Sequence, residues 1–552
     1  MYIYKYFCTF APENEEICVQ NMQFLNSEKD TIEVIEKIRK SLIENKWLLA
    51  YLFVMCGIII IYASFLKDDD DRYIQLMYNS LFFISISVSF ILMSGWIRKL
   101  ALIVFSILTI PSSIIETGWF LIDRSLLVSY QFNVIFATNP AEASGLLSQI
   151  QVWQWLLLAC YVSVALFLFI RALKENGARK KIIVSIIGAL LAISLIFVKG
   201  FRYNVPCLSL YSSYRGYQIA LKRAENFILN RQDISSQVCY ELPEDTTTIV
   251  IVIGESLTRN HCSLYGYGRL TNPRLSSRDD LIVYQDVKSP DFMTLIVLQQ
   301  ILTFSTKEHP EARWESPTLP ELLNAAGWYT YWYEPYEGWF PAHTPLPTSY
   351  SQIAQLCTKY HLCDDKEKYD AAYLNYLDTI FQDSTICRKV IFLHLIGNHF
   401  PYEKRYPESF KFFKEDDICS PYKERLNSKQ KATINAYDDA VRYNDWLIDS
   451  LLNQMCLLSG NCAMLYFPDH GEEVYDFDFY AGRSFNHITN SLYEIPCVYW
   501  QNASFAKSHP LHLNPLAPYN IENMIHTLLD LCAVSYCQKD TCRSLFRRQP
   551  AK

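Results

Sequence analysis

Long runs of apolar residues are confined to the first two hundred positions of this 552-residue chain. Each run is about 17 to 25 residues long, which lets a helix cross a hydrocarbon layer of roughly 30 Å. Charged residues stand at the ends of these runs rather than inside them, which argues against helices buried in a soluble core. The pattern therefore predicts five transmembrane helices, at residues 47–66, 73–97, 100–122, 153–173 and 182–198.

The short connections between these segments differ in their content of Lys and Arg. Basic residues gather before the first segment, between the second and third, and between the fourth and fifth, whereas the loop 123–152 contains one Arg and no Lys. Basic connections stay on the cytoplasmic side of a membrane. We therefore expect a cytoplasmic N-terminus and place residues 201–552 outside. The polar first 46 residues do not have the pattern of a cleaved signal peptide.

After residue 246, short apolar runs alternate with helical patterns, which is typical of a largely parallel sheet covered by helices. The predicted strands are residues 248–253, 328–333, 389–395, 463–467 and 495–500. The predicted helices are residues 291–303, 317–326, 367–381, 428–456 and 519–532. The expected organisation is a cytoplasmic segment (1–46), a five-helix transmembrane domain (47–200), a membrane-proximal linker (201–245) and an outer α/β domain (246–552).

The net charge of the chain limits the class of binding partner, and its cysteine content indicates the cellular compartment. A net charge of -7 and a pI near 5.9 argue against nucleic acid as a partner. Thirteen of the 17 cysteines lie after residue 200, and none is arranged as C-x2-C. Because an oxidising compartment converts close cysteines into disulfides, we expect several bridges among them, with Cys497 as a candidate free thiol. The close pairs are Cys357/Cys363, Cys456/Cys462 and Cys537/Cys542.

Carboxylate and imidazole side chains follow three of the predicted strands. They are Glu255 with Ser256, the stretch from His394 to His399, and the stretch from Asp469 to Glu472. In open α/β sheets, ligands bind where strands end and loops begin. A single His or Asp in a loop is usually a hydrogen-bonded surface or capping residue, but three such clusters at corresponding strand ends favour a divalent cation such as zinc.

Three motifs surround these residues in order: V-I-G-E-S at 252–256, with S-L-Y-G-Y and T-N-P shortly after it; F-L-H-L-I-G-N-H at 392–399; and F-P-D-H-G-E-E at 467–473. Together with the five-segment anchor, the set resembles bacterial phosphoethanolamine transferases of the alkaline phosphatase/sulfatase superfamily. The resemblance implies an inner-membrane enzyme with a periplasmic catalytic domain. It would transfer phosphoethanolamine from phosphatidylethanolamine to a cell-envelope glycan: lipid A, lipopolysaccharide core or periplasmic glucan.

The resemblance also implies a metal site and a nucleophile. Glu255, Asp469 and His470 would bind one zinc ion tightly, and a second ion is left open. Two threonines compete for the role of nucleophile and fourth ligand. Thr258 is nearer to Glu255 in sequence, whereas Thr294 lies 39 residues beyond it, at the start of an apolar helix. A helix N-terminus presents free N–H groups that favour a phosphate, so we expect Thr294.

Other residues are expected to contact the substrate. His399 and His487 resemble histidines that bind a second metal or the phosphoryl oxygens and assist proton transfer, and His394 and Glu472 are further candidates. Inside the membrane region, a carboxylate such as Glu116 is costly unless it faces protein, water or a positive group. The ammonium of ethanolamine is one such group, and interfacial exposure without a ligand is the alternative.

Rival interpretations remain open at this point. A phosphoglycerol transferase or a phosphodiesterase could use the same residues, and a sulfatase would require an oxidised Cys or Ser in place of Thr294. A non-catalytic membrane sensor could share the fold. Relatives that modify lipid A often flank the nucleophile with a disulfide, yet no cysteine occurs between Cys262 and Cys357. This difference points to a branch acting on another glycan.

Overall fold

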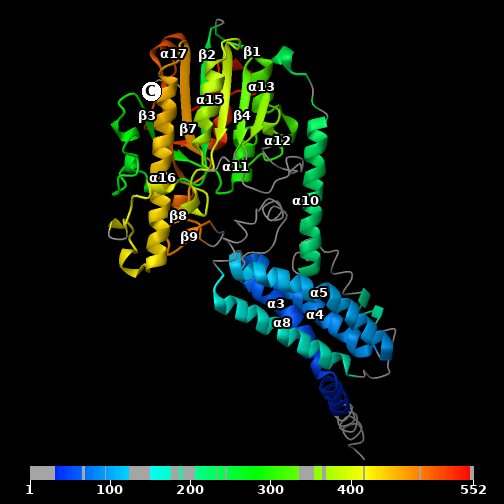
Figure 1. Ribbon diagram of the computed structural model, residues 1–552. Helices are drawn as coiled ribbons and strands as arrows, with labels where there is room; N and C mark the ends of the chain where they lie inside the picture. Colours follow the sequence, from blue (N-terminus) through cyan, green and yellow to red (C-terminus); the bar gives the residue numbers. More distant parts are fainter. Residues whose placement is uncertain are drawn as a thin grey trace, which may run out of the picture. The chain divides into compact units, whose positions relative to one another are not determined.

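The computed structural model describes two compact units, one up to Arg215 and the other from Gly216 onward (Figure 1). The described residues are 31–64, 69–93, 95–123, 150–175, 186–187, 189–190, 206–229, 231, 233–242, 245–334, 353–363, 369–414, 417–483 and 487–547. The predicted linker contains a helix, α10 (Pro206–Leu229).

The first unit is helical, and its long helices coincide with the first four predicted apolar segments. They are α3 (Lys46–Ser64), α4 (Asp69–Leu92), α5 (Gly95–Asp123) and α8 (Val152–Leu173). Among the described residues, Gly95–Leu121 and Val152–Leu173 are long and apolar enough to cross a membrane. Most of the fifth predicted segment, 182–198, lies outside the described residues, so the count of five stays a prediction.

A polar network joins three helix ends in this unit. Glu175, just after α8, accepts hydrogen bonds from the N–H groups of Trp47 and Leu48 at 2.9 and 3.1 Å, and so caps the start of α3. Arg98 is buried near the start of α5 and donates to Asn45 at 2.6 Å, while its Nη2 lies 3.5 Å from Glu175. The described basic residues Lys46, Arg98 and Lys174, which stand beside these helix ends, therefore lie at one end of the unit. Arg98 lies inside α5, not in a turn before it as the sequence predicts.

The second unit is built on an eight-stranded sheet with the order β11-β3-β10-β7-β2-β6-β4-β5. Strand β10 runs antiparallel to both its neighbours, and the other strands of this sheet share one direction. The prediction of a largely parallel α/β sheet is thus confirmed for this unit. The strands are β2 (Thr247–Gly254), β3 (Ile282–Lys288), β4 (Tyr329–Glu334), β5 (Lys359–Leu362), β6 (Arg388–His394), β7 (Asn461–Pro468), β10 (Glu494–Gln501) and β11 (Tyr519–Asn520).

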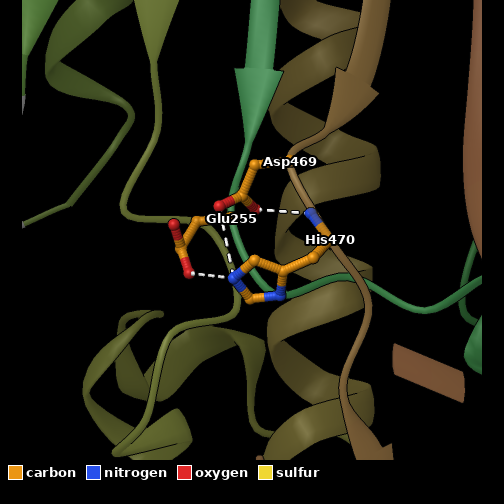
Figure 2. Close-up of side chains that lie close together, drawn as sticks. All are labelled: Glu255, Asp469 and His470. Carbon is orange, nitrogen blue, oxygen red and sulfur yellow. Dashed lines mark hydrogen bonds and ion pairs between the residues drawn. The ribbon is translucent and has the colours of Figure 1, made fainter. Parts of the chain in front are cut away.

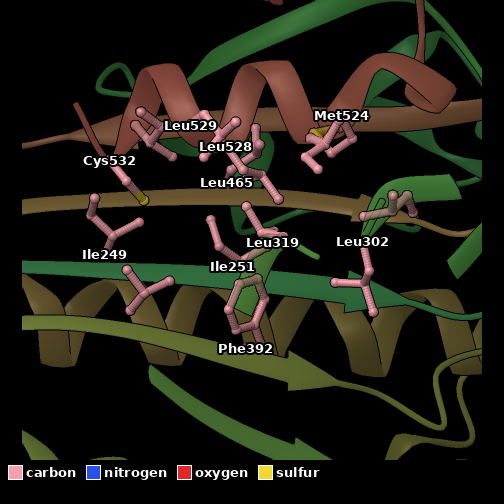
Figure 3. Packing of buried hydrophobic residues seen from close by; sticks show 14 of the residues in the cluster. Ile249, Ile251, Leu302, Leu319, Phe392, Leu465, Met524, Leu528, Leu529 and Cys532 are labelled. Atoms are coloured by element: carbon pink, nitrogen blue, oxygen red, sulfur yellow. The ribbon is translucent and has the colours of Figure 1, made fainter. Parts of the chain in front are cut away.

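Helices cover both faces of this sheet, which explains why its central strands are continuously apolar. On one face, Ile249 and Ile251 of β2 pack with the helices α11, α13 and α18 (Figure 3). On the other face, Val250 and Val252 pack with α15 and α16. The helices are α11 (Thr294–Ile301), α13 (Leu319–Ala325), α15 (Ala372–Gln382), α16 (Ser428–Met455) and α18 (Met524–Leu531).

The cysteines described in this unit are all free thiols, so the expected disulfides are wrong. Cys357 and Cys363 belong to hydrophobic clusters on opposite faces of the sheet, which prevents a bridge between them. Cys462 is buried in β7, whereas Cys456 is exposed at the end of α16. Cys497 is free and buried in β10, as expected. The argument for an outer location therefore rests on the basic residues and not on the cysteines.

Candidate metal centre

The carboxyl ends of two adjacent central strands bring three predicted ligands together. Glu255 follows β2, and Asp469 and His470 follow β7, whose last residue is paired with the last residue of β2. His470 Nε2 lies 3.3 Å from Glu255 Oε1 and 3.2 Å from Asp469 Oδ2 (Figure 2). One ligand atom from each residue lies within 4.8 Å of the others, and all three residues are buried.

Thr294 is the first residue of α11 and faces this cluster. Its Oγ1 donates a hydrogen bond to Glu255 Oε2 at 3.1 Å and lies 3.1 Å from His470 Nε2. The turn before the helix is fixed by Asp291, whose carboxylate accepts hydrogen bonds from the next two N–H groups at 2.8 and 3.1 Å. The hydroxyl at this helix start therefore lies against both a carboxylate and an imidazole.

The competing hydroxyl groups have other partners. Thr258 Oγ1 donates to the carbonyl of Glu494 at 3.3 Å, and its N–H donates to Tyr437 at 3.0 Å. Ser256 Oγ donates to Glu255 Oε1 at 2.7 Å and so helps to orient that carboxylate. The geometry favours Thr294 over Thr258, although the role of nucleophile stays a prediction.

The loop after β6 holds the backbone of Glu255 in place. Gly397 has a φ of 54°, and a Cβ at this position would lie 2.8 Å from the backbone N and O of Glu255. The next N–H, of Asn398, donates to the Glu255 carbonyl at 2.9 Å. Asp370 accepts from the N–H groups of Ile396 and Gly397, each at 2.9 Å. A glycine is therefore required where this loop crosses the ligand.

His470 has the protonation form that a metal ligand needs. Its Nδ1 lies 2.7 Å from the carbonyl of Gly471, which can only accept a hydrogen bond, so Nδ1 carries the proton. The lone pair of Nε2 then points toward the two carboxylates. Burial lowers the pKa of His470, and the neighbouring Arg483 lowers it further, so the ring is neutral near pH 7.

The two carboxylates fit a divalent cation. Burial raises the pKa of Asp469 well above its usual value, and the charge of Glu255 adds to this effect. Burial also acts to raise the pKa of Glu255, but its charged neighbours, Arg483 among them, hold it well below the usual range. Asp469 Oδ2 is buried and accepts no hydrogen bond within the described part of the chain. Two carboxylates, an imidazole and a hydroxyl form a donor set that zinc accepts.

Arg483 and Glu472 form a second pair beside these ligands. Glu472 accepts a hydrogen bond from Tyr402 at 2.8 Å, and its other oxygen lies 3.3 Å from Arg483 Nε. Burial raises the pKa of Glu472 to about 7, although Arg483 acts against it. Arg483 Nη1 donates to His470 Nε2 at 2.5 Å. Sequence reasoning missed Arg483; the available signal was that it is the only basic residue between Glu472 and His487.

Two of the predicted histidines lie near the same edge of the sheet. His399 is partly exposed on the loop after β6, and its charge contributes to the lowered pKa of Glu255. His394 ends β6, and its Nδ1 lies 3.8 Å from a carboxylate oxygen of Glu334, which ends the adjacent strand β4. A contribution of either histidine to substrate binding stays a prediction.

His487 and Glu116 lie in other surroundings. The His487 ring stacks on Tyr480 at 4.2 Å, and its Nδ1 lies 2.5 Å from Asp478. These contacts do not include a residue of the metal centre, so the structure does not bring His487 into it. Glu116 is buried in α5 of the helical unit.

Comparisons with known proteins agree with the chemistry of this site. Residues 247–534 match the sulfatase family. Phosphoethanolamine transferase EptC of Escherichia coli K12 is 32% identical over 322 residues, which are 56% of this chain and 55% of EptC. The chain thus spans about half the length of this curated relative. Phosphoethanolamine transferase CptA of Salmonella typhimurium is 28% identical over 91% of each chain.

Solved structures show the same architecture. The periplasmic domain of Escherichia coli EptC in complex with zinc covers 57% of this chain and 90% of that domain, with 30% identity and a TM-score of 0.53. The integral membrane protein EptA from Neisseria meningitidis, a lipooligosaccharide phosphoethanolamine transferase, covers 92% of this chain and 99% of its own. Its identity is 17% and its TM-score 0.59, so this second likeness concerns the fold alone.

Proposed function

Because this chain belongs to the sulfatase family, we propose that it is a membrane-bound phosphoethanolamine transferase that uses Thr294 as nucleophile. The observation that carries the proposal is the position of Thr294 Oγ1, 3.1 Å from both Glu255 Oε2 and His470 Nε2. EptC and CptA, which carry that name, support the reaction class. The donor is phosphatidylethanolamine, and the acceptor is a hydroxyl of a cell-envelope glycan.

The metal centre would hold zinc through Glu255, Thr294, Asp469 and His470. When bound there, zinc lowers the pKa of a coordinated hydroxyl and neutralises charge on phosphoryl oxygens. The relative EptC has been solved with zinc, which supports this choice of metal. One tightly bound ion accounts for the residues brought together, and a second would need histidines such as His394 and His399.

Transfer proceeds in two displacements at phosphorus. In the first, Thr294 Oγ1 gives up its proton and forms a bond to phosphorus, while the bond to the diacylglycerol oxygen breaks and that oxygen takes up a proton. In the second, an acceptor hydroxyl gives up its proton and bonds to phosphorus, while the bond to Thr294 breaks and the Thr294 oxygen takes up a proton again. His399, on the edge of the site, is placed to supply or accept these protons. His487 would have to leave Asp478 to do the same.

The helical unit is the anchor that brings the site to its lipid donor. We propose the five transmembrane helices of the sequence prediction, a cytoplasmic N-terminus and a periplasmic catalytic unit in a bacterial inner membrane. Glu116 is the candidate to receive the ammonium of the donor inside the helical unit, since a buried carboxylate in a membrane helix favours a positive partner.

The test uses the full-length protein in detergent with labelled phosphatidylethanolamine and purified lipopolysaccharide or periplasmic glucan. Transfer should require zinc and should be lost in Thr294→Ala, while Thr294→Ser keeps part of it. Thr433→Ala, the same change at a partly exposed position of α16, is the matched control. Transfer from phosphatidylglycerol in place of phosphatidylethanolamine would identify a phosphoglycerol transferase and contradict the proposal.

A further inference from the structure

Arg483 places a positive charge inside the metal centre, in direct contact with a metal ligand. It follows β9 (Ala481–Gly482), which pairs with β8 (Glu473–Val474) to form a short hairpin directly after Glu472. Its Nη1 donates to His470 Nε2 at 2.5 Å and to the carbonyl of Phe292 at 3.2 Å. Its Nη2 lies 3.9 Å from Glu255. The guanidinium thus touches a ligand and the turn before Thr294 at once.

This contact and a bound metal ion exclude each other. The Nδ1 of His470 is committed to the Gly471 carbonyl, so Nε2 offers its single lone pair either to Arg483 or to a metal. A zinc ion on an imidazole nitrogen lies about 2.0–2.1 Å from it. The guanidinium therefore has to leave Nε2 when a metal binds.

Charge nevertheless keeps the guanidinium in the site. Glu255, Asp469 and Glu472 supply three negative charges when ionised, against one positive charge from Arg483. A divalent ion adds the two positive charges that balance the set, so both cations are accommodated together. The contact of Arg483 Nε with Glu472, which is itself held by Tyr402, provides a tether that is independent of His470.

We propose that Arg483 has two positions: on His470 before metal binding, and on Glu472 afterwards, where it binds the phosphoryl oxygens of the substrate. A planar guanidinium with several donors suits a phosphodiester, and its contact with Phe292 places it beside the start of α11. This role deepens the proposed function and rests on it for the identity of the phosphoryl substrate. The ligand class recognised is the anionic oxygens of a phosphoryl group.

The experiment measures zinc affinity of the full-length protein by competition with a chelator. Arg483→Met should bind zinc about tenfold more tightly than wild type, because no charged group has to be displaced. Arg274→Met, which removes a largely exposed arginine paired with Asp449, should leave the affinity unchanged. A merely structural role of Arg483 would not raise the affinity. An equal or weaker affinity in Arg483→Met, with the melting temperature of the zinc-loaded protein unchanged, would overturn the proposal.

Binding of inorganic phosphate to the zinc-loaded protein tests the second position. Calorimetry should show about tenfold weaker binding in Arg483→Met, with Arg483→Lys intermediate because it keeps the charge without the planar fork. If Arg483→Met does not fold, phosphate binding is measured on Arg483→Lys instead. Unchanged phosphate affinity in both variants would refute the phosphoryl-binding role. Neither measurement depends on phosphoethanolamine transfer. A wrong donor or acceptor in the proposed function would therefore leave both results unchanged, and a wrong role for Arg483 would change them.

Discussion

Two buried clusters of histidine and carboxylate in the described part of the second unit differ in how their charges are balanced. In the metal centre, Asp469 and Glu255 face a neutral His470. In the other, which we call the His261 cluster, Asp438 and Asp476 face His261, Arg269 and Tyr267. His261 lies 2.5 Å from Asp438 and 3.2 Å from Asp476, and Arg269 lies 2.6 Å from Asp438.

The two imidazoles respond in opposite directions. Burial acts to lower the pKa of His261, but Asp476 and Asp438 outweigh it and raise the pKa to about 10. The pKa of His470 is lowered by burial and by Arg483. In the His261 cluster, two cations match two carboxylates and Tyr267 donates a further hydrogen bond at 3.0 Å. The comparison indicates that two buried carboxylates form a candidate metal site when the neighbouring His and Arg side chains do not neutralise their charge.

The largest expected effect is that of Asp469→Asn, and it distinguishes the two clusters by the amount of zinc that the protein binds. Asp469→Asn should lose bound zinc and reduce transfer more than about a hundredfold, since even changes to the outer partners of metal ligands reach that size. The metal-free stability should not fall, because the amide removes repulsion with Glu255. Elemental analysis and transfer assays check this. Full zinc occupancy in the variant would place the ion elsewhere.

Asp438→Asn should show the opposite behaviour. It leaves His261 and Arg269 as buried cations with one carboxylate fewer, which costs about 3–5 kcal/mol of folding stability. Zinc per protein should stay as in wild type. Urea unfolding followed by tryptophan fluorescence measures the loss, with Asp279→Asn at an exposed position as the control. A stable Asp438→Asn that has lost its zinc would reverse the assignment of the two clusters.

The third expected effect is a pH dependence of the His261 cluster. Because folding raises the pKa of His261 from its ordinary 6.5 to about 10, its ion pairs stabilise the fold fully below pH 6.5. This stabilisation is lost as the pH rises through about 10. His261→Gln should therefore be less stable than wild type at pH 6, with the gap closing toward pH 10. Melting temperatures across this range test it, and a gap independent of pH would contradict an ionised His261.

The sheet and most of the metal centre could be predicted because both follow from short-range patterns. A strand buried on both faces is continuously apolar, as in β2, and polar residues directly after such strands must lie at one edge of the sheet. Glu255, Asp469 and His470 satisfy this rule. Thr294 required the additional argument of a helix start.

Other features depend on the path of the chain in three dimensions. Arg483 reaches His470 only because the β8–β9 hairpin folds back, and the same hairpin engages His487 with Asp478 and Tyr480 instead of the ligands. The spacing of Cys357 and Cys363 carries no information about the sheet that lies between them. The pattern of a single sequence shows neither how a hairpin folds back nor which element lies between two cysteines.

The most direct test of the account locates the phosphoethanolamine group during the reaction. Full-length protein incubated with phosphatidylethanolamine and no acceptor should carry one such group, and peptide mass spectrometry should place it on Thr294. Thr294→Ala removes the hydrogen bond of its hydroxyl to the Glu255 carboxylate, which costs about 1.5–3 kcal/mol, so the variant should fold, carry no group and transfer nothing. A group found on Thr258 or Ser256, or full transfer by Thr294→Ala, would contradict the central claim.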